Sequence, residues 1–138
     1  MKITAFTDGA ARGNPGEAGI GIVLKDEHDA TIHTIKRYIG KTTNNVAEYT
    51  ALVTLLEFIK KSETLRCTEL VVHTDSELMA RQIKGEYKVK DPGLKLLYQK
   101  VKLQLHDAPF TFSIHHIPRS RNEQADALAN EAIDSKAL

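Results

Sequence analysis

The sequence predicts an α/β protein built on one mixed five-stranded sheet, three antiparallel strands followed by two parallel ones, flanked by helices. Three segments near the amino terminus alternate apolar and polar residues and are joined by short turns, which predicts an antiparallel meander. After residue 45 the apolar spacing changes to that of a helix, and short apolar strands then alternate with helices. Right-handed crossovers place the last two strands parallel to the first.

Turn chemistry separates the strands of the meander. The first strand is expected to end at Asp8-Gly9, and Gly13-Asn14-Pro15-Gly16 after it is dense in turn-forming residues. A polar hairpin tip at Asp26–Asp29 joins the second strand to the third. The three predicted strands are Lys2–Asp8, Ala18–Lys25 and Thr31–Ile39.

The rest of the chain is expected to alternate between helices and two short strands. A wide apolar stripe predicts a long helix over Asn45–Lys61. Gly85 ends the second helix, Pro92-Gly93 opens the third, and Asn122 is expected to cap the last. The remaining predicted elements are the strand Glu69–Thr74, the helix Ser76–Lys84, the helix marked by Leu94, Leu97, Tyr98, Val101 and Leu105, the strand Thr111–Ile117 and the helix Glu123–Ala132.

Length and composition favour a single domain over residues 1–138. The 138 residues are 41% hydrophobic, enough for one core, and no apolar run approaches the ~18 residues of a membrane span. Asp8 interrupts the amino-terminal segment, which argues against a cleavable secretory signal, and the single Cys67 excludes an internal disulfide framework. We therefore expect a cytoplasmic monomer with no membrane association and no obligate protein partner.

Positive charge is concentrated in one part of a chain whose net charge is only +1. From Arg81 to Lys102 there are seven basic and two acidic residues. Such a basic stripe could bind a polyanion. The alternative is that these residues are simply the solvated face of a helix and a loop.

Four carboxylates lie at predicted element ends: Asp8, Glu48, Asp75 and Asp126. The carboxyl ends of parallel strands meet at one edge of a sheet, where α/β proteins usually bind ligands. Hard oxygen donors suit Mg²⁺ or Mn²⁺, and two such ions about 3.5–4 Å apart form a clamp for phosphoryl transfer.

Each carboxylate also has a purely structural alternative. Glu48 could close a capping box with Asn45, and Asp75 could be the N-cap of the helix that follows it. Asp126 near a helix start is favourable with the helix dipole alone, and Asp8-Gly9 could open an ordinary turn.

The residues around these carboxylates decide between the two interpretations. In order and spacing they resemble the type-1 ribonuclease H family, over a stretch from about Lys2 to Ile133. The motifs that carry the resemblance are Phe6-Thr7-Asp8-Gly9-Ala10 with Gly13-Asn14-Pro15-Gly16, Thr43-Asn44-Asn45-Val46-Ala47-Glu48-Tyr49, His73-Thr74-Asp75-Ser76, and Asn122-Glu123-Gln124-Ala125-Asp126-Ala127-Leu128-Ala129.

The resemblance implies a ribonuclease H-like fold and an activity. Members of this family are endonucleases that hydrolyse the RNA strand of RNA/DNA hybrids by a two-metal-ion mechanism and leave 5′-phosphate and 3′-hydroxyl ends. The expected cofactor is Mg²⁺, two ions per site, with Mn²⁺ as a substitute. The expected partner is an RNA/DNA hybrid.

The resemblance also assigns residues. Asp8, Glu48, Asp75 and Asp126 match the metal-binding carboxylates, and His116, ten residues before Asp126, matches a mobile catalytic histidine. Arg119 could instead supply a cation near the scissile phosphate. The matches for substrate contacts are Asn14, Asn44 and Asn45 for the 2′-hydroxyls of the RNA strand and Thr43 for a phosphate of the DNA strand.

The chain departs from some family members in lacking room for a basic protrusion. Only eight residues, Gly85–Pro92, span the gap where that extra helix and loop would stand, and we expect no separate amino-terminal hybrid-binding domain. Lys84, Lys88 and Lys90 are therefore expected to substitute in part by touching phosphates.

Three rival functions stay open at this point. The first is a catalytically silent module of the same fold that only binds hybrid or structured RNA. The second is a phosphotransferase with Asp8 as nucleophile, which would need a second Asp where this chain has Ala10. The third is a transposase or junction resolvase, which would keep the carboxylates without needing the asparagines.

Overall fold

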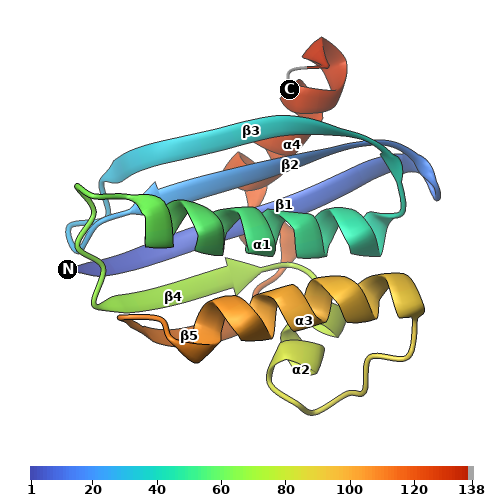
Figure 1. Cartoon of the computed structure of the whole chain (residues 1–138). Helices are drawn as coiled ribbons and strands as arrows, with labels where there is room; N and C mark the ends of the chain where they lie inside the picture. Colours follow the sequence, from blue (N-terminus) through green and yellow to red (C-terminus); the bar gives the residue numbers. More distant parts are fainter. Residues whose placement is uncertain (137–138) are drawn as a thin grey trace.

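Five strands form one sheet in the order β3-β2-β1-β4-β5 in the computed structural model, which describes residues 1–136 (Figure 1). β1 pairs antiparallel with β2, and β2 with β3, while β4 runs parallel to β1 and β5 parallel to β4. The mixed five-stranded sheet predicted from the sequence is therefore confirmed. The strands are β1 (Lys2–Gly13), β2 (Gly16–Lys25), β3 (Thr31–Thr42), β4 (Glu69–Thr74) and β5 (Thr111–His116).

Helices cover both faces of this sheet. α1 and α3 lie on one face, and α4 lies on the other, behind β1 and β2 in the view of Figure 1. The core is built mainly between the sheet and α1, where Leu52, Leu55 and Leu56 are fully buried. The helices are α1 (Asn44–Lys61), α2 (Glu77–Ile83), α3 (Pro92–His106) and α4 (Glu123–Ser135), with a 3₁₀ turn at Arg119–Arg121. Within residues 1–136, no helix is both long and apolar enough to cross a membrane.

Two glycines let the helices approach the sheet at backbone distance. A Cβ atom on Gly9 would lie 2.2 Å from the carbonyl carbon of Ala47 in α1, and one on Gly21 would lie 2.1 Å from the carbonyl oxygen of Ala125 in α4. Neither position has room for a side chain. Because Ala47 and Ala125 immediately precede Glu48 and Asp126, these two contacts bring both acidic residues against the strands.

The first strand continues five residues past the end predicted for it. Residues 9–13 of β1 pair with residues 16–20 of β2, down to Gly13 opposite Gly16, and the turn between them contains a cis Asn14–Pro15 peptide. The parallel ladder with β4 ends earlier, at Thr7 opposite Thr74. The prediction that Asp8 ends its strand is therefore wrong. Asp8 lies within β1, directly after the last residue that pairs with β4. β3 is extended for the same reason, since its residue 42 still finds Gly16 as a partner.

Two of the structural alternatives for the carboxylates are wrong. The N-cap of α1 is Thr43, whose Oγ1 accepts from the N–H of Val46 at 3.3 Å, so Glu48 closes no capping box. The N-cap of α2 is Ser76, whose Oγ accepts from the N–H of Met79 at 3.2 Å, so Asp75 is not a cap.

The last helix is tied to the sheet by its N-cap residue. Asn122 occupies the N-cap position of α4, but its side chain makes no capping hydrogen bond. Instead its Nδ2 donates to the carbonyl oxygen of Thr7 at 2.9 Å. The start of α4 is thereby held one residue from Asp8.

Candidate active site

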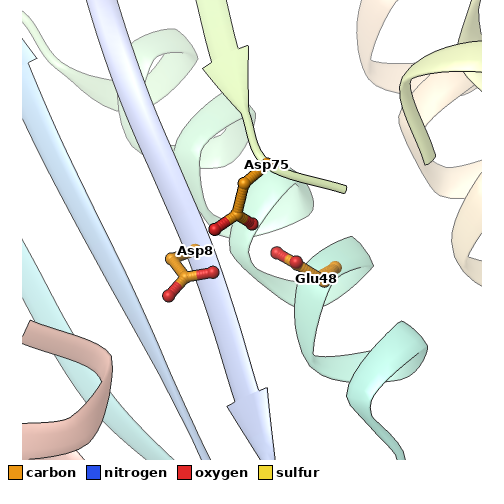
Figure 2. A group of neighbouring side chains, drawn as sticks. All are labelled: Asp8, Glu48 and Asp75. Atoms are coloured by element: carbon orange, nitrogen blue, oxygen red, sulfur yellow. The ribbon is translucent and has the colours of Figure 1, made fainter. Parts of the chain in front are cut away.

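Three carboxylates from separate elements converge at the edge where β4 ends. Asp8 comes from the middle of β1, Glu48 from α1, and Asp75 from the residue after β4. One oxygen from each lies within 4.8 Å of the others, and Figure 2 shows the three side chains turned toward one another. Three negatively charged groups at this separation repel one another strongly unless a cation or a proton lies between them.

The backbone of β1 holds one of these carboxylates in place. The Gly9 N–H donates to Oε1 of Glu48 at 2.8 Å, a bond between residues 39 apart in the sequence. Only 4% of Asp8 and 6% of Glu48 is exposed, while Asp75 is half-buried. The site is thus a preformed anionic pocket with its opening on the side of Asp75.

Burial and mutual repulsion change the protonation of the site. Burial, followed by the charge of Asp75, raises the pKa of Asp8 to about 9. Burial, followed by the charge of Asp8, raises the pKa of Glu48 well above its ordinary value. Carboxylate oxygens grouped in this way are the donor set that hard divalent cations prefer, and such a cation would take the place of the bound protons. The residues present therefore fit a divalent metal ion.

Asp126 lies beside this group rather than inside it. Its carboxyl contributes to the raised pKa of Asp8 through a hydrogen bond, and Nη2 of Arg119 lies 3.6 Å from its Oδ1. All four carboxylates line one cavity of about 520 Å³. Asp8 thus lies between the other carboxylates, with Glu48 and Asp75 on one side of it and Asp126 on the other.

Two of the four predicted substrate-contact residues line the same cavity, and the other two, Asn14 and Thr43, adjoin them. Asn44 and Asn45 line it, and hydrogen bonds tie the end of β1 to the start of α1. Oδ1 of Asn44 accepts from the N–H of Ala11, and Oδ1 of Asn14 accepts from the N–H of Asn44, each at 3.0 Å. With both oxygens engaged, the amide NH₂ groups are the donors that these side chains can offer a ligand. Thr43 stands at the amino terminus of α1, where unpaired N–H groups favour anions.

The two candidates for a cationic or acid–base role differ in position. Arg119 lines the cavity. His116 is exposed at the last residue of β5 and is not among the described residues that line it. Its neighbour His115 lies on the other face of the strand, with its ring 5.7 Å from that of His73.

The predicted phosphate-contacting lysines lie outside the cavity. Lys84 is the C-cap of α2, and Lys88 and Lys90 follow in the segment that leads to α3. All three are exposed. The backbone of this segment is held by Gln82, whose Nε2 donates to the Lys88 carbonyl oxygen at 3.4 Å.

Arg12 and Asn130 also line the cavity, and the sequence had not singled them out. Asn130 could have been found from the sequence, because it lies four residues after Asp126 and therefore on the same helix face. Nothing in the local sequence marks Arg12, whose contacts are with residues more than 100 positions away.

Comparisons with known proteins agree with this geometry. The family model described as Reverse transcriptase-like matches residues 6–132. The chain is 42% identical to the Bifunctional protein Rv2228c of Mycobacterium tuberculosis over 99% of its own length. It is 34% identical to the Ribonuclease H of Alkalilimnicola ehrlichii, over 94% of this chain and 93% of that protein. Among solved structures, LC11-RNase H1 in complex with RNA/DNA hybrid superposes with a TM-score of 0.91 at 47% identity, covering 97% of this chain and 98% of that one.

The relatives differ in how much of their own length the match occupies. The chain spans 37% of the length of the mycobacterial protein but nearly all of the Alkalilimnicola one. The match to the Alkalilimnicola ribonuclease H, together with the family model over most of the chain, shows which family the chain belongs to. With its mixed sheet and the carboxylate pocket at the end of the parallel ladder, the chain belongs to the ribonuclease H family.

Proposed function

We propose that this chain is a ribonuclease H that hydrolyses the RNA strand of RNA/DNA hybrids as an endonuclease, with residues 1–138 acting as a single domain and as a monomer. The observation that carries the proposal is the meeting of Asp8, Glu48 and Asp75 oxygens within 4.8 Å of one another. The solved relative described as bound to an RNA/DNA hybrid supports the substrate class. The products expected are 5′-phosphate and 3′-hydroxyl ends.

The carboxylates would hold two Mg²⁺ ions, with Mn²⁺ as a substitute. Asp8, Glu48 and Asp75 offer one group of oxygen donors, and Asp8 with Asp126 offers a second. When bound, a pair of divalent cations supplies Lewis-acid stabilisation of the attacking and departing oxygens of the phosphodiester. The protein's own part is to keep the carboxylates in place, and the Gly9 N–H bond to Glu48 does this for one of them while favouring its ionised form against the effect of burial.

The asparagines account for the choice of strand. Amide donors of Asn44 and Asn45, which line the cavity, and of Asn14, which is hydrogen-bonded to the Asn44 backbone, would bond 2′-hydroxyls, which only the RNA strand carries. Thr43 and the amino terminus of α1 would receive a phosphate of the DNA strand. These contacts involve sugar and phosphate and no base edge, so little sequence preference is expected.

Two side chains beyond the carboxylates would assist the reaction. His116, exposed at the end of β5, would take up or deliver a proton at neutral pH. Arg119, 3.6 Å from Asp126, would place a positive charge near the scissile phosphate.

The test is cleavage of matched labelled RNA/DNA, RNA/RNA and DNA/DNA duplexes, with and without Mg²⁺, by the wild-type chain and by Asp75→Asn. We expect Mg²⁺-dependent cutting of the RNA strand of the hybrid alone, and a loss of at least about a hundredfold in the variant. Binding of hybrid without cutting would favour the catalytically silent module. Equal cutting of DNA/DNA would favour a nuclease of another class.

The three exposed lysines are tested separately. Replacing all three of Lys84, Lys88 and Lys90 by Ala should weaken hybrid binding. The slope of log K against log[salt] should become shallower by about 2–3, because each lysine accounts for one phosphate contact. Fluorescence anisotropy from 50 to about 200 mM salt measures that slope. An unchanged slope would remove these residues from the interface.

A further inference from the structure

One face of α4 carries a row of three polar residues spaced four apart, Asp126, Asn130 and Asp134. Residues with this spacing lie one above another on a helix. Arg12, near the end of β1, reaches across to this row. Its Nη1 pairs with Oδ1 of Asp134, and its Nη2 lies 3.3 Å from Oδ1 of Asn130. Arg12 and Asn130 both line the cavity that holds the four carboxylates.

The chemistry of its neighbours allows the Asn130 amide only one orientation. The Arg12 guanidinium can only donate hydrogen bonds, so it must face the amide oxygen. The NH₂ end is then turned toward Asp126, where it donates to Oδ1 at 3.2 Å and to the backbone oxygen at 3.0 Å. An ionised carboxylate can only accept, so the row from Arg12 through Asn130 to Asp126 is satisfied at each step.

From these contacts we infer that Asn130 is a positioning residue, which holds the Asp126 carboxylate toward Asp8, and that Arg12 fixes the orientation of the Asn130 amide. The inference rests on the proposed function, in which Asp126 is a metal ligand. A hydrogen-bond donor behind a metal-binding carboxylate fixes the orientation of that carboxylate. Removing such a donor typically lowers metal affinity or activity by about 10- to 100-fold.

Asn130 is better anchored beside Asp126 than the cationic side chain near it, Arg119. The Arg119 side chain is 78% exposed and its Nη2 lies 3.6 Å from Asp126 Oδ1, whereas Asn130 is half-buried and belongs to the same helix as Asp126. The Arg12–Asp134 pair is itself exposed on both sides, so it contributes little to folding stability. The consequence of losing this row should therefore appear at the metal site rather than in the fold.

The sharpest variant is Asn130→Asp, which keeps the size and shape of the side chain but removes the donor and adds a negative charge beside Asp126. Asn130→Ala removes the donor without adding charge. We expect Asn130→Ala to lower Mg²⁺ affinity, measured by calorimetry without substrate, by about tenfold, and to lower kcat on the hybrid by a similar factor with KM within about twofold. Asn130→Asp should be worse than Asn130→Ala in both measurements, and a higher Mg²⁺ concentration should restore part of the lost kcat.

The role of Arg12 is tested with a matched pair of ion-pair variants. Arg12→Ala should reduce Mg²⁺ affinity and kcat by about threefold, and Arg12→Lys, which keeps the positive charge and N–H donors but loses the planar fork, should recover part of the loss. The control is Lys36→Ala, which breaks another exposed strand-to-α4 pair, Lys36 with Glu131 at 3.4 Å, without touching this row. It should leave both values unchanged.

Three outcomes would count against the inference, and each is distinct. Folded Asn130 variants with wild-type Mg²⁺ affinity and kcat would overturn the positioning role while leaving the proposed function intact. A raised KM with unchanged kcat in Arg12→Ala would assign Arg12 to substrate binding and overturn its part. A wild-type chain that neither binds Mg²⁺ nor cuts the hybrid would overturn the proposed function and this inference together.

Discussion

Replacing Asp8 with Asn should stabilise the metal-free protein at neutral and mildly alkaline pH while abolishing cleavage of the hybrid. The pKa of Asp8 is raised to about 9, first by burial and then by the charge of Asp75. Between the unfolded value of 3.8 and this folded value, the native state keeps a proton that the unfolded chain has lost. The stability of the wild type is therefore highest below the unfolded pKa and falls as the pH rises toward 9. Asn carries no charge at any of these pH values, so this loss disappears in the variant.

The size of the effect follows from the shift. At pH 7 the unfolded pKa lies about 3 units below the solution pH, and at about 1.4 kcal/mol per unit the ceiling is about 4 kcal/mol. Glu48 and Asp75 share the repulsion, so part of it remains when Asp8 is neutral. We therefore expect about 2 kcal/mol, which for a chain of this length corresponds to a rise in Tm of about 7 °C.

Thermal and urea unfolding in EDTA between about pH 5 and 9, repeated with Mg²⁺, would measure this. Without metal, the Tm of the wild type should fall across this range and that of Asp8→Asn should fall less. With Mg²⁺, the wild type should gain more than the variant, because the ions take the place of the bound protons among a complete set of carboxylate ligands.

Asp107→Asn is the matched control, because a hydrogen bond from Lys60 lowers the pKa of Asp107. The ionised Asp107 carboxylate stabilises the fold above its unfolded pKa, and this contribution is lost as the pH falls. Replacing Asp107 with Asn should therefore not stabilise the protein at any pH. An Asp8→Asn protein that is less stable than the wild type at pH 8 in EDTA, with the same pH slope, would refute the reasoning.

Three further substitutions, two of them paired with a control variant, test the local structure by urea unfolding. Gly9→Ala should destabilise the fold by about 3 kcal/mol, because the new Cβ would lie 2.2 Å from the Ala47 carbonyl carbon. Gly93→Ala is the control and should change stability by less than about 1 kcal/mol, because its Cβ would meet only Oδ1 of Asp91 at 3.2 Å. Ser76→Ala should cost about 1 kcal/mol through the lost cap of α2, while Asp75→Asn should cost nothing, since Asp75 caps no helix. Tyr49→Phe should cost about 1–2 kcal/mol, because the Tyr49 hydroxyl donates to the buried Oε1 of Gln82 at 2.6 Å.

Much of the fold followed from signals that act over a few residues. The alternation in the first three strands, the turn around Pro15 and the helical spacing after residue 45 each predicted an element that the structure contains. The order of strands and helices was enough to predict the mixed sheet, because right-handed crossovers leave few other arrangements. The candidate site came from four motifs in order, each centred on a carboxylate.

The ends of elements and the partners of side chains depended on contacts that the local sequence does not contain. β1 runs on to Gly13 because β2 is there to pair with it, and only the earlier end of β4 leaves Asp8 at an edge. The partner of Glu48 is the Gly9 N–H across a sheet-to-helix contact, not the capping site three residues before it in its own helix.

The sequence by itself determined which side chains are available for chemistry and on which kind of element each one stands, because periodicity, turns and motif order are local properties of the chain. Tertiary structure alone decided that Asp8, Glu48 and Asp75 share one buried group of oxygens, that Asp126 stands beside it, and that Arg12 and Asn130 join the cavity. The physical reason is that residues far apart in sequence meet only when Gly9 and Gly21 let α1 and α4 lie directly on the sheet, and burial then sets the charge and affinity of the pocket.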